Sequence, residues 1–287
     1  MKENDQIRRL GDLRNHVNHE LQLSGIQNHS LESDLILTHL LDISRAFLHS
    51  HPEYVPDPHL IIRLNSILER RKSGEPLQYL LGRTSFFGYE IEVGSGVLIP
   101  RPETETLVEE ALNRFHKGTF LDWGTGSGCI TVAILKETSS TNAIAVEKDQ
   151  RAMTWAWKNL NKYGLFPRTL LLNLDARSNI PIGDNTLDLI VSNPPYIEHS
   201  AISGLDKSVM DHEPHIALDG GTGGLELFLP ILALGSRKLK KGAYLIVECG
   251  GARQANYLES ESFNGLVHSF TRDDVRGIPR IVGWCRV

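Results

Sequence analysis

The sequence predicts an α/β fold in which a doubly wound sheet follows a small helical bundle, with a β-hairpin joining the two. Two observations support this. Up to about residue 80, apolar residues recur at helical spacing, whereas from residue 119 onward apolar strand-like runs alternate with helical segments. We expect a helical domain at residues 1–83, a hairpin linker at 84–101 and the sheet domain at 102–287.

Three apolar runs in the N-terminal part predict four or five helices. They explain a core and carry no chemistry of their own. Between the second and third runs, Pro52, Pro56 and Pro58 mark a loop. The runs are Ile7-Leu10-Leu13-Val17-Leu21, Leu31-Leu35-Leu40-Leu41 and Leu60-Ile61-Leu64-Ile67-Leu68.

A junction with strand-like composition follows the bundle. Aromatic and β-branched residues surround Gly88 in residues 82–93, which predicts a short hairpin. Further on, Pro102 with the acidic Glu103 and Glu105 predicts the start of a helix, because proline and negative charge both favour a helix N-terminus.

The remaining chain alternates between the two kinds of element. Helices are expected after the first two strands and at residues 225–239. This order is typical of a doubly wound sheet. The expected strands lie at residues 120–121, 143–147, 169–172, 187–192, 244–248 and 281–285.

Composition excludes several classes of protein. Of the 287 residues 40% are hydrophobic and 23% charged, and no apolar run approaches the roughly 20 residues of a membrane span. The polar first residues contain no secretory signal. A net charge of -5 argues against nucleic acid as the direct target. Three cysteines without CxxC spacing predict neither disulfides nor a zinc site, and they favour the cytoplasm.

A glycine-rich loop follows the first strand of the sheet. Gly124, Gly126 and Gly128 allow a tight turn and a close approach to a ligand. A dinucleotide fingerprint would have glycine or alanine where Cys129 stands. The spacing instead resembles the loop of class I methyltransferases that holds the methionine part of S-adenosylmethionine, and Asp122 would then face its ammonium group. A purely structural turn is the alternative. The expected cofactor contacts are Asp122, Trp123, Gly124, Thr125 and Gly126.

Acidic residues end the next two strands. In Rossmann-like sheets, a carboxylate in the place of Glu147 accepts hydrogen bonds from the ribose hydroxyls, although a lone glutamate there could equally be a surface residue. Asp175 and Ala176 end the third strand, where this fold usually contacts adenine.

The fourth strand ends in Ser192-Asn193-Pro194-Pro195-Tyr196. An amide nitrogen is a poor nucleophile, so an enzyme that methylates it must hold both N–H groups with acceptors. Asn193 offers its side-chain oxygen and Pro194 its carbonyl. The prolines stiffen the turn, and Tyr196 offers a flat face to a planar group. A neutral thioether leaves, so no metal is needed. A proline-rich loop without function is the alternative.

Several segments together resemble the HemK/PrmC family, whose members methylate the glutamine of peptide-chain release factors. The resemblance covers the chain from about residue 74 and is weaker over the N-terminal helices. The matching segments are 74–79 (GEPLQY), 86–88 (FFG), 98–105 (LIPRPETE), 193–197 (NPPYI), 213–218 (EPHIAL), 220–224 (GGTGG) and 274–280.

The resemblance implies an N-terminal helical domain that docks the substrate and a seven-stranded methyltransferase domain. It implies transfer from S-adenosylmethionine to the side-chain nitrogen (N5) of the glutamine in a release factor's Gly-Gly-Gln motif. Asn193, Pro194 and Tyr196 would act in catalysis, residues 193–196 would bind the glutamine, and Asn193 would also touch the cofactor.

The chain departs from the family pattern at three positions, and two alternative functions stay open. Trp123 stands where an aliphatic residue is commoner and Glu147 where aspartate is commoner, and both keep the chemistry. Ala176 replaces a frequent aromatic residue, which leaves the adenine pocket undefined. A DNA or RNA adenine-N6 methyltransferase shares the NPPY motif but predicts a basic cleft. A non-catalytic S-adenosylmethionine-binding or ribosome-associated adaptor predicts damage to the glycine loop or to NPPY, and both are intact.

Overall fold

The computed structural model describes residues 9–175, 177–178, 180–261 and 263–287, so Ile7 and Ala176 lie outside the described residues. The chain divides into two compact units, which we describe separately. One comprises Met1–Gly82 and Lys207–His212, and the other comprises Arg83–Asp206 and Glu213–Val287. In the described ranges, no helix combines the length and the apolar character that a membrane crossing requires.

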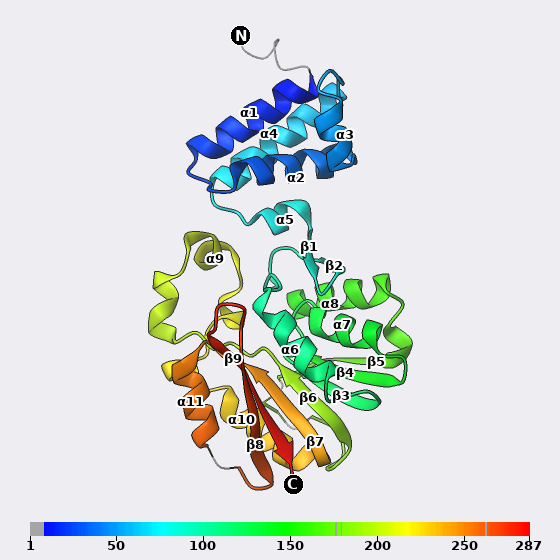
Figure 1. Ribbon diagram of the computed structural model, residues 1–287, viewed down its shortest axis with the longest axis vertical. Coiled ribbons are helices and arrows are strands. Elements are labelled where there is room, and N and C mark those ends of the chain that lie inside the picture. Colours follow the sequence, from blue (N-terminus) through cyan, green and yellow to red (C-terminus); the bar gives the residue numbers. More distant parts are fainter. Residues whose placement is uncertain (1–8, 176, 179, 262) are drawn as a thin grey trace. The chain divides into compact units, whose positions relative to one another are not determined.

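The first unit is helical, as the sequence predicts (Figure 1). Pro58 begins the long helix α4, and the Asp57 carboxylate accepts a hydrogen bond from the amide of His59, a usual N-terminal cap. The short helix α9, Lys207–His212, groups with this unit. The other helices and α4 are α1 (Leu10–Leu23), α2 (His29–Leu41), α3 (Arg45–Ser50), α4 (Pro58–Lys72) and α5 (Leu77–Leu81).

The apolar residues of this unit form one core, with a correction in α2. Leu31 and Leu35 belong to the predicted periodic run but are exposed. The buried face of α2 contains the predicted Leu40 together with Ile36 and Leu37, which the run did not include. Since apolar residues surround more than one side of α2, periodicity alone could not identify the buried side.

A carboxylate is buried in this helical core. Asp34 on α2 is 1% exposed and accepts hydrogen bonds from Arg14 at 2.6 Å, Arg45 at 2.9 Å and His49 at 2.8 Å. Burial works to raise the pKa of Asp34, but the bonds from Arg14, His49 and Arg45 outweigh it and lower that pKa. The carboxylate therefore joins α1, α2 and α3 through charge.

We expect Asp34→Ala to destabilise the first unit by about 3 kcal/mol. This is the low end for a broken buried ion pair, because the partners Arg14 and Arg45 keep 30% and 61% of their side chains exposed. Amide hydrogen exchange in α1 to α4 measures the free energy of opening. Asp12→Ala removes an exposed carboxylate from α1 and is the matched control. Equal protection in both variants would contradict a stabilising role for Asp34.

The second unit begins with the predicted hairpin, β1 (Arg83–Phe86) and β2 (Tyr89–Glu92). Phe87 and Gly88 form its turn with φ values of 51° and 77°, as a two-residue type I′ turn requires. Asn159 holds β2 from the side: its Oδ1 accepts from the amide of Glu92 at 2.8 Å, and its Nδ2 donates to the Glu92 carbonyl at 2.9 Å. The hairpin is thus fixed to the helix that carries Asn159.

A seven-stranded sheet forms the centre of this unit, with the order β5-β4-β3-β6-β7-β9-β8. The strands β3 to β7 are parallel, and β9 runs antiparallel to both β7 and β8. The sequence predicted six of these strands and missed β8. The strands are β3 (Gly118–Trp123), β4 (Thr141–Glu147), β5 (Thr169–Asn173), β6 (Leu187–Ser192), β7 (Leu239–Glu248), β8 (Leu266–Asp273) and β9 (Pro279–Arg286).

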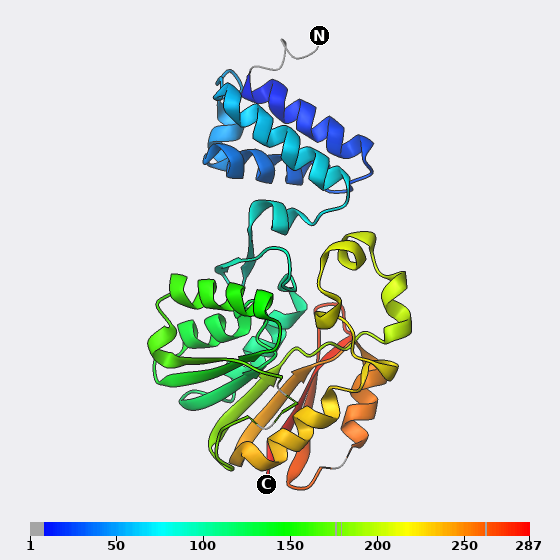
Figure 2. The same ribbon diagram turned by 180° about the vertical axis from the view of Figure 1, so that it is seen from behind.

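Helices cover both faces of the sheet, so the central strands are buried and rich in valine, isoleucine and leucine. Neighbouring helices α6, α7 and α8 pack along one face, whereas Figure 2 shows α10 and α11 in front of the other. The doubly wound prediction is confirmed. The helices are α6 (Glu103–Leu112), α7 (Cys129–Glu137), α8 (Gln150–Lys162), α10 (Phe228–Lys238) and α11 (Ala252–Ser260).

The strand order changes direction between β3 and β6, and this position determines where a ligand binds. From β3 the chain proceeds outward through β4 to β5, and it then returns to place β6 on the other side of β3. A crevice forms outside the carboxyl ends of the strands at such a point. The glycine loop follows β3, Glu147 ends β4 and Asn193 follows β6, so the topology brings the three predicted motifs to one edge.

Candidate active site

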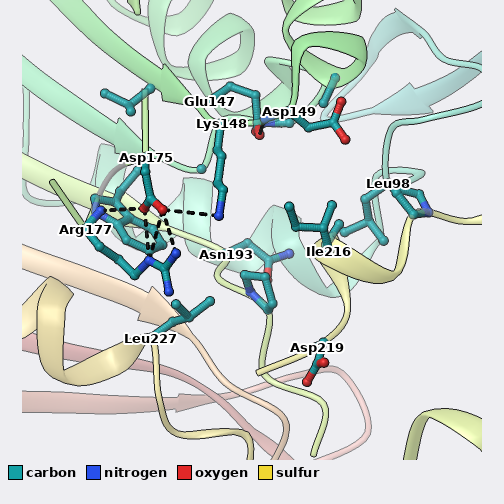
Figure 3. Close-up of a pocket in the computed structure, with 18 of the residues that line it drawn as sticks. Leu98, Glu147, Lys148, Asp149, Asp175, Arg177, Asn193, Ile216, Asp219 and Leu227 are labelled. Atoms are coloured by element: carbon teal, nitrogen blue, oxygen red, sulfur yellow. Dashed lines mark hydrogen bonds and ion pairs between the residues drawn. The ribbon is translucent and has the colours of Figure 1, made fainter. Parts of the chain in front are cut away.

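A pocket of about 210 Å³ opens at this edge of the sheet (Figure 3). Residues of the glycine loop and residues that end or follow β4, β5 and β6 line it, although these strands are far apart in the chain. Ala176 lies outside the described residues, while Asp122, Thr125, Pro194 and Tyr196 do not line the pocket. The predicted residues that do are Trp123, Gly124, Gly126, Glu147, Asp175, Asn193 and Pro195.

The glycine loop has the backbone that its sequence predicts. Gly124, Gly126 and Gly128 have φ values of 76°, 56° and 79°, which side-chain-bearing residues rarely adopt. An ideal Cβ at Gly124 or Gly126 would meet nothing within 4 Å, whereas one at Gly128 would lie 3.3 Å from the Cα of Ala156. The first two glycines therefore leave space for a ligand, and the third allows α8 to pack closely.

Asp122 is buried beneath this loop. Its Oδ2 accepts hydrogen bonds from the hydroxyls of Thr125 and Thr131, both at 2.6 Å. Its Oδ1 is buried and has no hydrogen-bond partner among the described residues. Burial, with a smaller contribution from nearby Glu147, raises the pKa of Asp122 to about 6 against the effect of the two threonines. A ligand that supplies a cationic donor would satisfy Oδ1.

Glu147 supports the loop and faces the pocket. Its Oε2 accepts from the amide of Gly126 at 2.9 Å, and its Oε1 accepts from the amide of Asp149 at 2.8 Å. Burial raises the pKa of Glu147, although these backbone bonds oppose the shift. Each carboxylate oxygen has a second lone pair, so Glu147 can also accept from ligand hydroxyls.

Two basic residues that sequence reasoning missed gather around Asp175. Arg177 bonds to its Oδ2 at 2.6 Å, and the Lys148 ammonium lies 3.2 Å from the same oxygen (Figure 3). The bond from Arg177 lowers the pKa of Asp175 far below its usual range, against the effect of burial. All three residues line the pocket. This end of the pocket therefore contains two cationic side chains beside the carboxylate of Asp175, whereas the sequence analysis named only the carboxylate.

Asn193 lines the pocket, and only the nitrogen of its side-chain amide is hydrogen-bonded within the described part of the chain. Its Nδ2 donates to the hydroxyl of Thr104, on the first turn of α6, at 3.0 Å. Its Oδ1 accepts no hydrogen bond from the described residues. The structure therefore leaves the acceptor that the amide-holding hypothesis requires. Thr104 was missed because it lies 89 positions away in the sequence.

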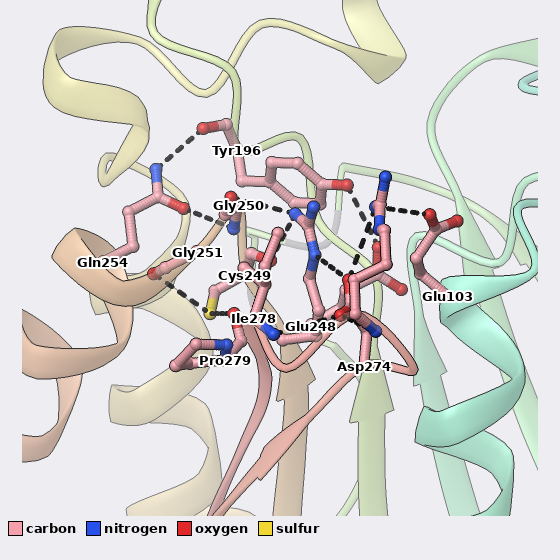
Figure 4. A network of polar contacts seen from close by, with 12 residues as sticks. Glu103, Tyr196, Glu248, Cys249, Gly250, Gly251, Gln254, Asp274, Ile278 and Pro279 are labelled. Atoms are coloured by element: carbon pink, nitrogen blue, oxygen red, sulfur yellow. Dashed lines mark hydrogen bonds and ion pairs between the residues drawn. The ribbon is translucent and has the colours of Figure 1, made fainter.

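Tyr196 does not line this pocket and instead lines a second hollow beside α11. Its hydroxyl donates to Glu248 Oε1 at 3.1 Å, and Figure 4 shows the two side chains within a larger polar network. Burial raises the pKa of Glu248, at the end of β7, to about 7, against the effect of hydrogen bonds from Thr104 and Tyr196. The Oε2 of Glu248 is buried and has no close partner among the described residues.

A second glycine-rich loop, residues 220–224, packs against the backbone of the residues that follow β6. A Cβ at Gly220 would lie 2.7 Å from the Pro195 carbonyl oxygen, and one at Gly224 only 2.0 Å from that of Tyr196. Gln254 joins the layers, because its Nε2 donates to the Tyr196 carbonyl at 2.8 Å and its Oε1 accepts from the amide of Gly250 at 2.7 Å (Figure 4). These glycines make the close approach possible.

Further pocket residues come from segments to which the sequence gave no role. Leu98 and Ile216 add apolar surface near Asn193 (Figure 3). The buried Glu213 fixes these segments together, since it accepts from the amide of Ile99 at 3.1 Å and pairs with Arg101. The sequence did contain a signal for these residues, because segment 213–218 matches the family. That match alone assigned no role to Glu213 or Ile216.

The pocket presents a combination of groups that fits a ligand with a cationic amine and hydroxyl groups. The glycine cradle leaves room for a chain, and Glu147 suits a diol. Asp122 does not line the pocket, but its unpartnered Oδ1 lies beneath the loop and suits the amine. Across the described residues, no group of three or more metal-binding side chains occurs.

Comparisons with known proteins match both parts of the chain. Residues 12–82 match the model of the PrmC N-terminal domain, and residues 90–214 match that of the methyltransferase small domain. The release factor glutamine methyltransferase of Geobacter sulfurreducens is 37% identical and covers 90% of this chain and 90% of its own. That of Mycolicibacterium smegmatis is 33% identical and covers 93% of this chain and 94% of its own.

Solved structures support the fold. The catalytic domain of hMettl16, solved in complex with the MAT2A 3′UTR hairpin 6, aligns with a TM-score of 0.54 and 16% identity over 80% of this chain and 82% of that one. At this identity the likeness shows the fold alone. The prediction of a class I methyltransferase fold with a methyltransferase activity is confirmed. The extent and identity of the sequence matches show that the chain belongs to the release factor glutamine methyltransferase family.

Proposed function

We propose that this chain transfers a methyl group from S-adenosylmethionine to the side-chain nitrogen (N5) of the glutamine in the Gly-Gly-Gln motif of peptide-chain release factors. Family membership supports the substrate. The observation that carries the chemistry is the Asn193 side chain, whose Nδ2 is held by Thr104 and whose Oδ1 is left as an acceptor beside the glycine loop.

Cofactor contacts are assigned to three places in the pocket. Gly124 and Gly126 would lie against the methionine part, with Asp122 Oδ1 below them to accept from its ammonium group. Glu147 would accept from the ribose hydroxyls, and Asp175, which lines the same pocket, would contact the adenine. When bound, S-adenosylmethionine supplies a methyl group on a sulfonium, which any correctly oriented nucleophile can accept.

The protein's part in the reaction is to make an amide nitrogen nucleophilic. Asn193 Oδ1 and the Pro194 carbonyl would each accept one N–H of the glutamine, so that the nitrogen lone pair points toward the methyl group. As the new N–C bond forms, the nitrogen gains positive charge and its N–H groups become stronger donors. Both hydrogen bonds therefore strengthen toward the transition state, which is the requirement for catalysis. The S–C bond breaks, the neutral thioether leaves and the nitrogen loses one proton to solvent.

The proposal includes no metal, because a neutral leaving group needs no Lewis acid. It also includes no direct nucleic-acid target and no membrane partner. The net charge of -5 supports the absence of a nucleic-acid target. A cytoplasmic place of action is also proposed, and the three free cysteines support it. The N-terminal helices, residues 1–83, are proposed to dock the protein substrate, with residues 84–101 as the linker and 102–287 as the methyltransferase domain.

Methyl transfer from tritiated cofactor to purified release factor and to DNA tests the proposal. We expect label on the release factor, with mass spectrometry placing it on the glutamine of the Gly-Gly-Gln motif, and no effect of EDTA. Label on adenine would support the adenine-N6 alternative instead. Loss of activity with EDTA would contradict the metal-free mechanism.

We expect Glu147→Ala to weaken cofactor binding by about 1.5–3 kcal/mol, the contribution of hydrogen bonds to a charged group. Isothermal titration calorimetry measures this directly. Glu109→Ala, which removes an exposed carboxylate from α6, should bind as wild type does. Equal affinity in the two variants would remove Glu147 from the proposed ribose site.

A further inference from the structure

We propose that Glu213 is a positioning residue which sets the distance between the bound cofactor and the substrate glutamine, because it joins two walls of the pocket. The inference rests on the proposed function. The walls are residues 94–99 and residues 213–219, and Glu213 itself does not line the pocket. The first wall contributes Gly96 and Leu98 to the lining, and the second contributes Pro214, Ile216, Ala217 and Asp219 (Figure 3).

The 94–99 wall is fastened to α8. Trp155 Nε1 donates to the Ser95 carbonyl at 3.3 Å, and the backbone at Gly94 lies so close to the Trp155 ring that a Cβ there would clash with it. The helix α8 follows directly on β4, whose last residue is Glu147, the proposed ribose ligand. This wall is therefore fixed relative to the cofactor site.

The 213–219 wall is fastened to the segment that is proposed to bind the glutamine. Ile197, the residue after that segment, donates its amide to the Leu218 carbonyl at 3.0 Å, and its own carbonyl accepts from the amide of Gly220 at 2.8 Å. These bonds pair Ile197 with Asp219 in a short parallel bridge. This wall is therefore fixed relative to the glutamine site.

Glu213 joins the two walls through both of its carboxylate oxygens. Its side chain is 1% exposed. The Oε2 atom accepts from the amide of Ile99 at 3.1 Å, and the Oε1 atom accepts from Arg101 Nη2 at 2.5 Å. If this link is lost, each wall keeps its own anchor, but nothing at Glu213 holds one wall to the other.

The reaction depends on the distance that this link controls. Methyl transfer requires the attacking nitrogen and the methyl carbon to lie in line at about 3–3.5 Å. One wall is fixed to the cofactor site and the other to the glutamine site, so Glu213 affects this distance without touching either reactant. Since each ligand keeps the contacts of its own wall, the loss of Glu213 should fall on the transfer rate rather than on the affinity for either ligand.

Glu213→Gln tests the link in single-turnover methylation of release factor. Glutamine keeps the shape, but its amide accepts only through its oxygen, so its NH₂ group would face one of the two donors. We expect the rate at saturating cofactor to fall by roughly 10–100-fold, as for a misplaced reacting group. The cofactor affinity measured by calorimetry should stay within about threefold of wild type. Glu198→Gln removes a carboxylate that is 42% exposed, and as the matched control it should keep the wild-type rate.

Two variants of Arg101 test the same link from its other end. Arg101→Met removes one donor, and because Arg101 is 32% exposed this variant is informative even if Glu213→Gln does not fold. We expect Arg101→Met to slow methylation and Arg101→Lys, which keeps a charged donor for Oε1, to recover most of the rate. In a Glu213→Gln background, Arg101→Met should cause no further loss beyond about twofold, because both changes break one link.

The outcomes separate this inference from the proposed function. A wild-type rate in Glu213→Gln or in Arg101→Met would overturn the inference alone. So would losses that multiply in the double variant, or a fall in cofactor affinity as large as the fall in rate. Failure of the wild-type chain to methylate release factor would overturn the proposed function instead.

Discussion

Asn193→Ala is expected to lower the single-turnover rate of glutamine methylation by about 10²–10³. The residue is half-buried at the pocket, and Thr104 holds its Nδ2, so the fold loses one hydrogen bond while the substrate loses a preorganised acceptor. Since that acceptor binds more tightly in the transition state than in the ground state, the loss should fall on the rate more than on substrate affinity.

Rapid-quench methylation with saturating cofactor measures this rate. Asn193→Asp keeps the shape and an acceptor, so partial activity is expected there and not in the alanine variant. Asn142→Ala removes an exposed asparagine from the start of β4 and should behave as wild type. A rate for Asn193→Ala within tenfold of wild type would overturn the proposed mechanism.

Deleting residues 1–82 is expected to leave cofactor binding intact and to reduce methylation of full-length release factor by about 10²-fold or more. All the pocket-lining residues belong to the second unit, whereas the first contributes a helical core and no cofactor motif. A docking domain acts by positioning, since binding energy away from the reacting nitrogen holds that nitrogen in place.

A short peptide containing Gly-Gly-Gln is the control substrate for this deletion. It is too small to use a docking domain, so the full and truncated chains should methylate it at similar rates. Calorimetry with S-adenosylmethionine checks that the truncated chain folds. A truncated chain that methylates full-length release factor at the normal rate would show that docking lies elsewhere.

The parts of the fold and the site that sequence predicted are those whose signals are local. Gly124, Gly126, Glu147 and Asn193 each directly follow or end a strand, and the order of a parallel sheet brings strand ends together. Positive φ at the glycines follows from the residue type. Such features need only the neighbouring residues to be interpreted.

The parts that sequence missed depend on distant partners. Thr104 appeared only as a residue of a helix start, and Glu248 only as the end of a strand, until folding placed both beside Asn193 and Tyr196. The strand β8 was missed for another reason: most of its residues are exposed or half-buried, so it lacks a clear apolar alternation.

The position of β9 has a consequence for how this sheet folds. It follows β8 in the chain but lies between β8 and β7, so neither of those strands has its full set of neighbours until β9 has been synthesised. Trp284 of β9 is buried in the same core cluster as Trp123, beside the glycine loop. A growing chain that has already made every cofactor motif therefore still exposes one edge of β7 and part of that core. We expect the half of the sheet that supports Glu248 to be completed last during synthesis, because β7 gains its second neighbour only when β9 pairs with it.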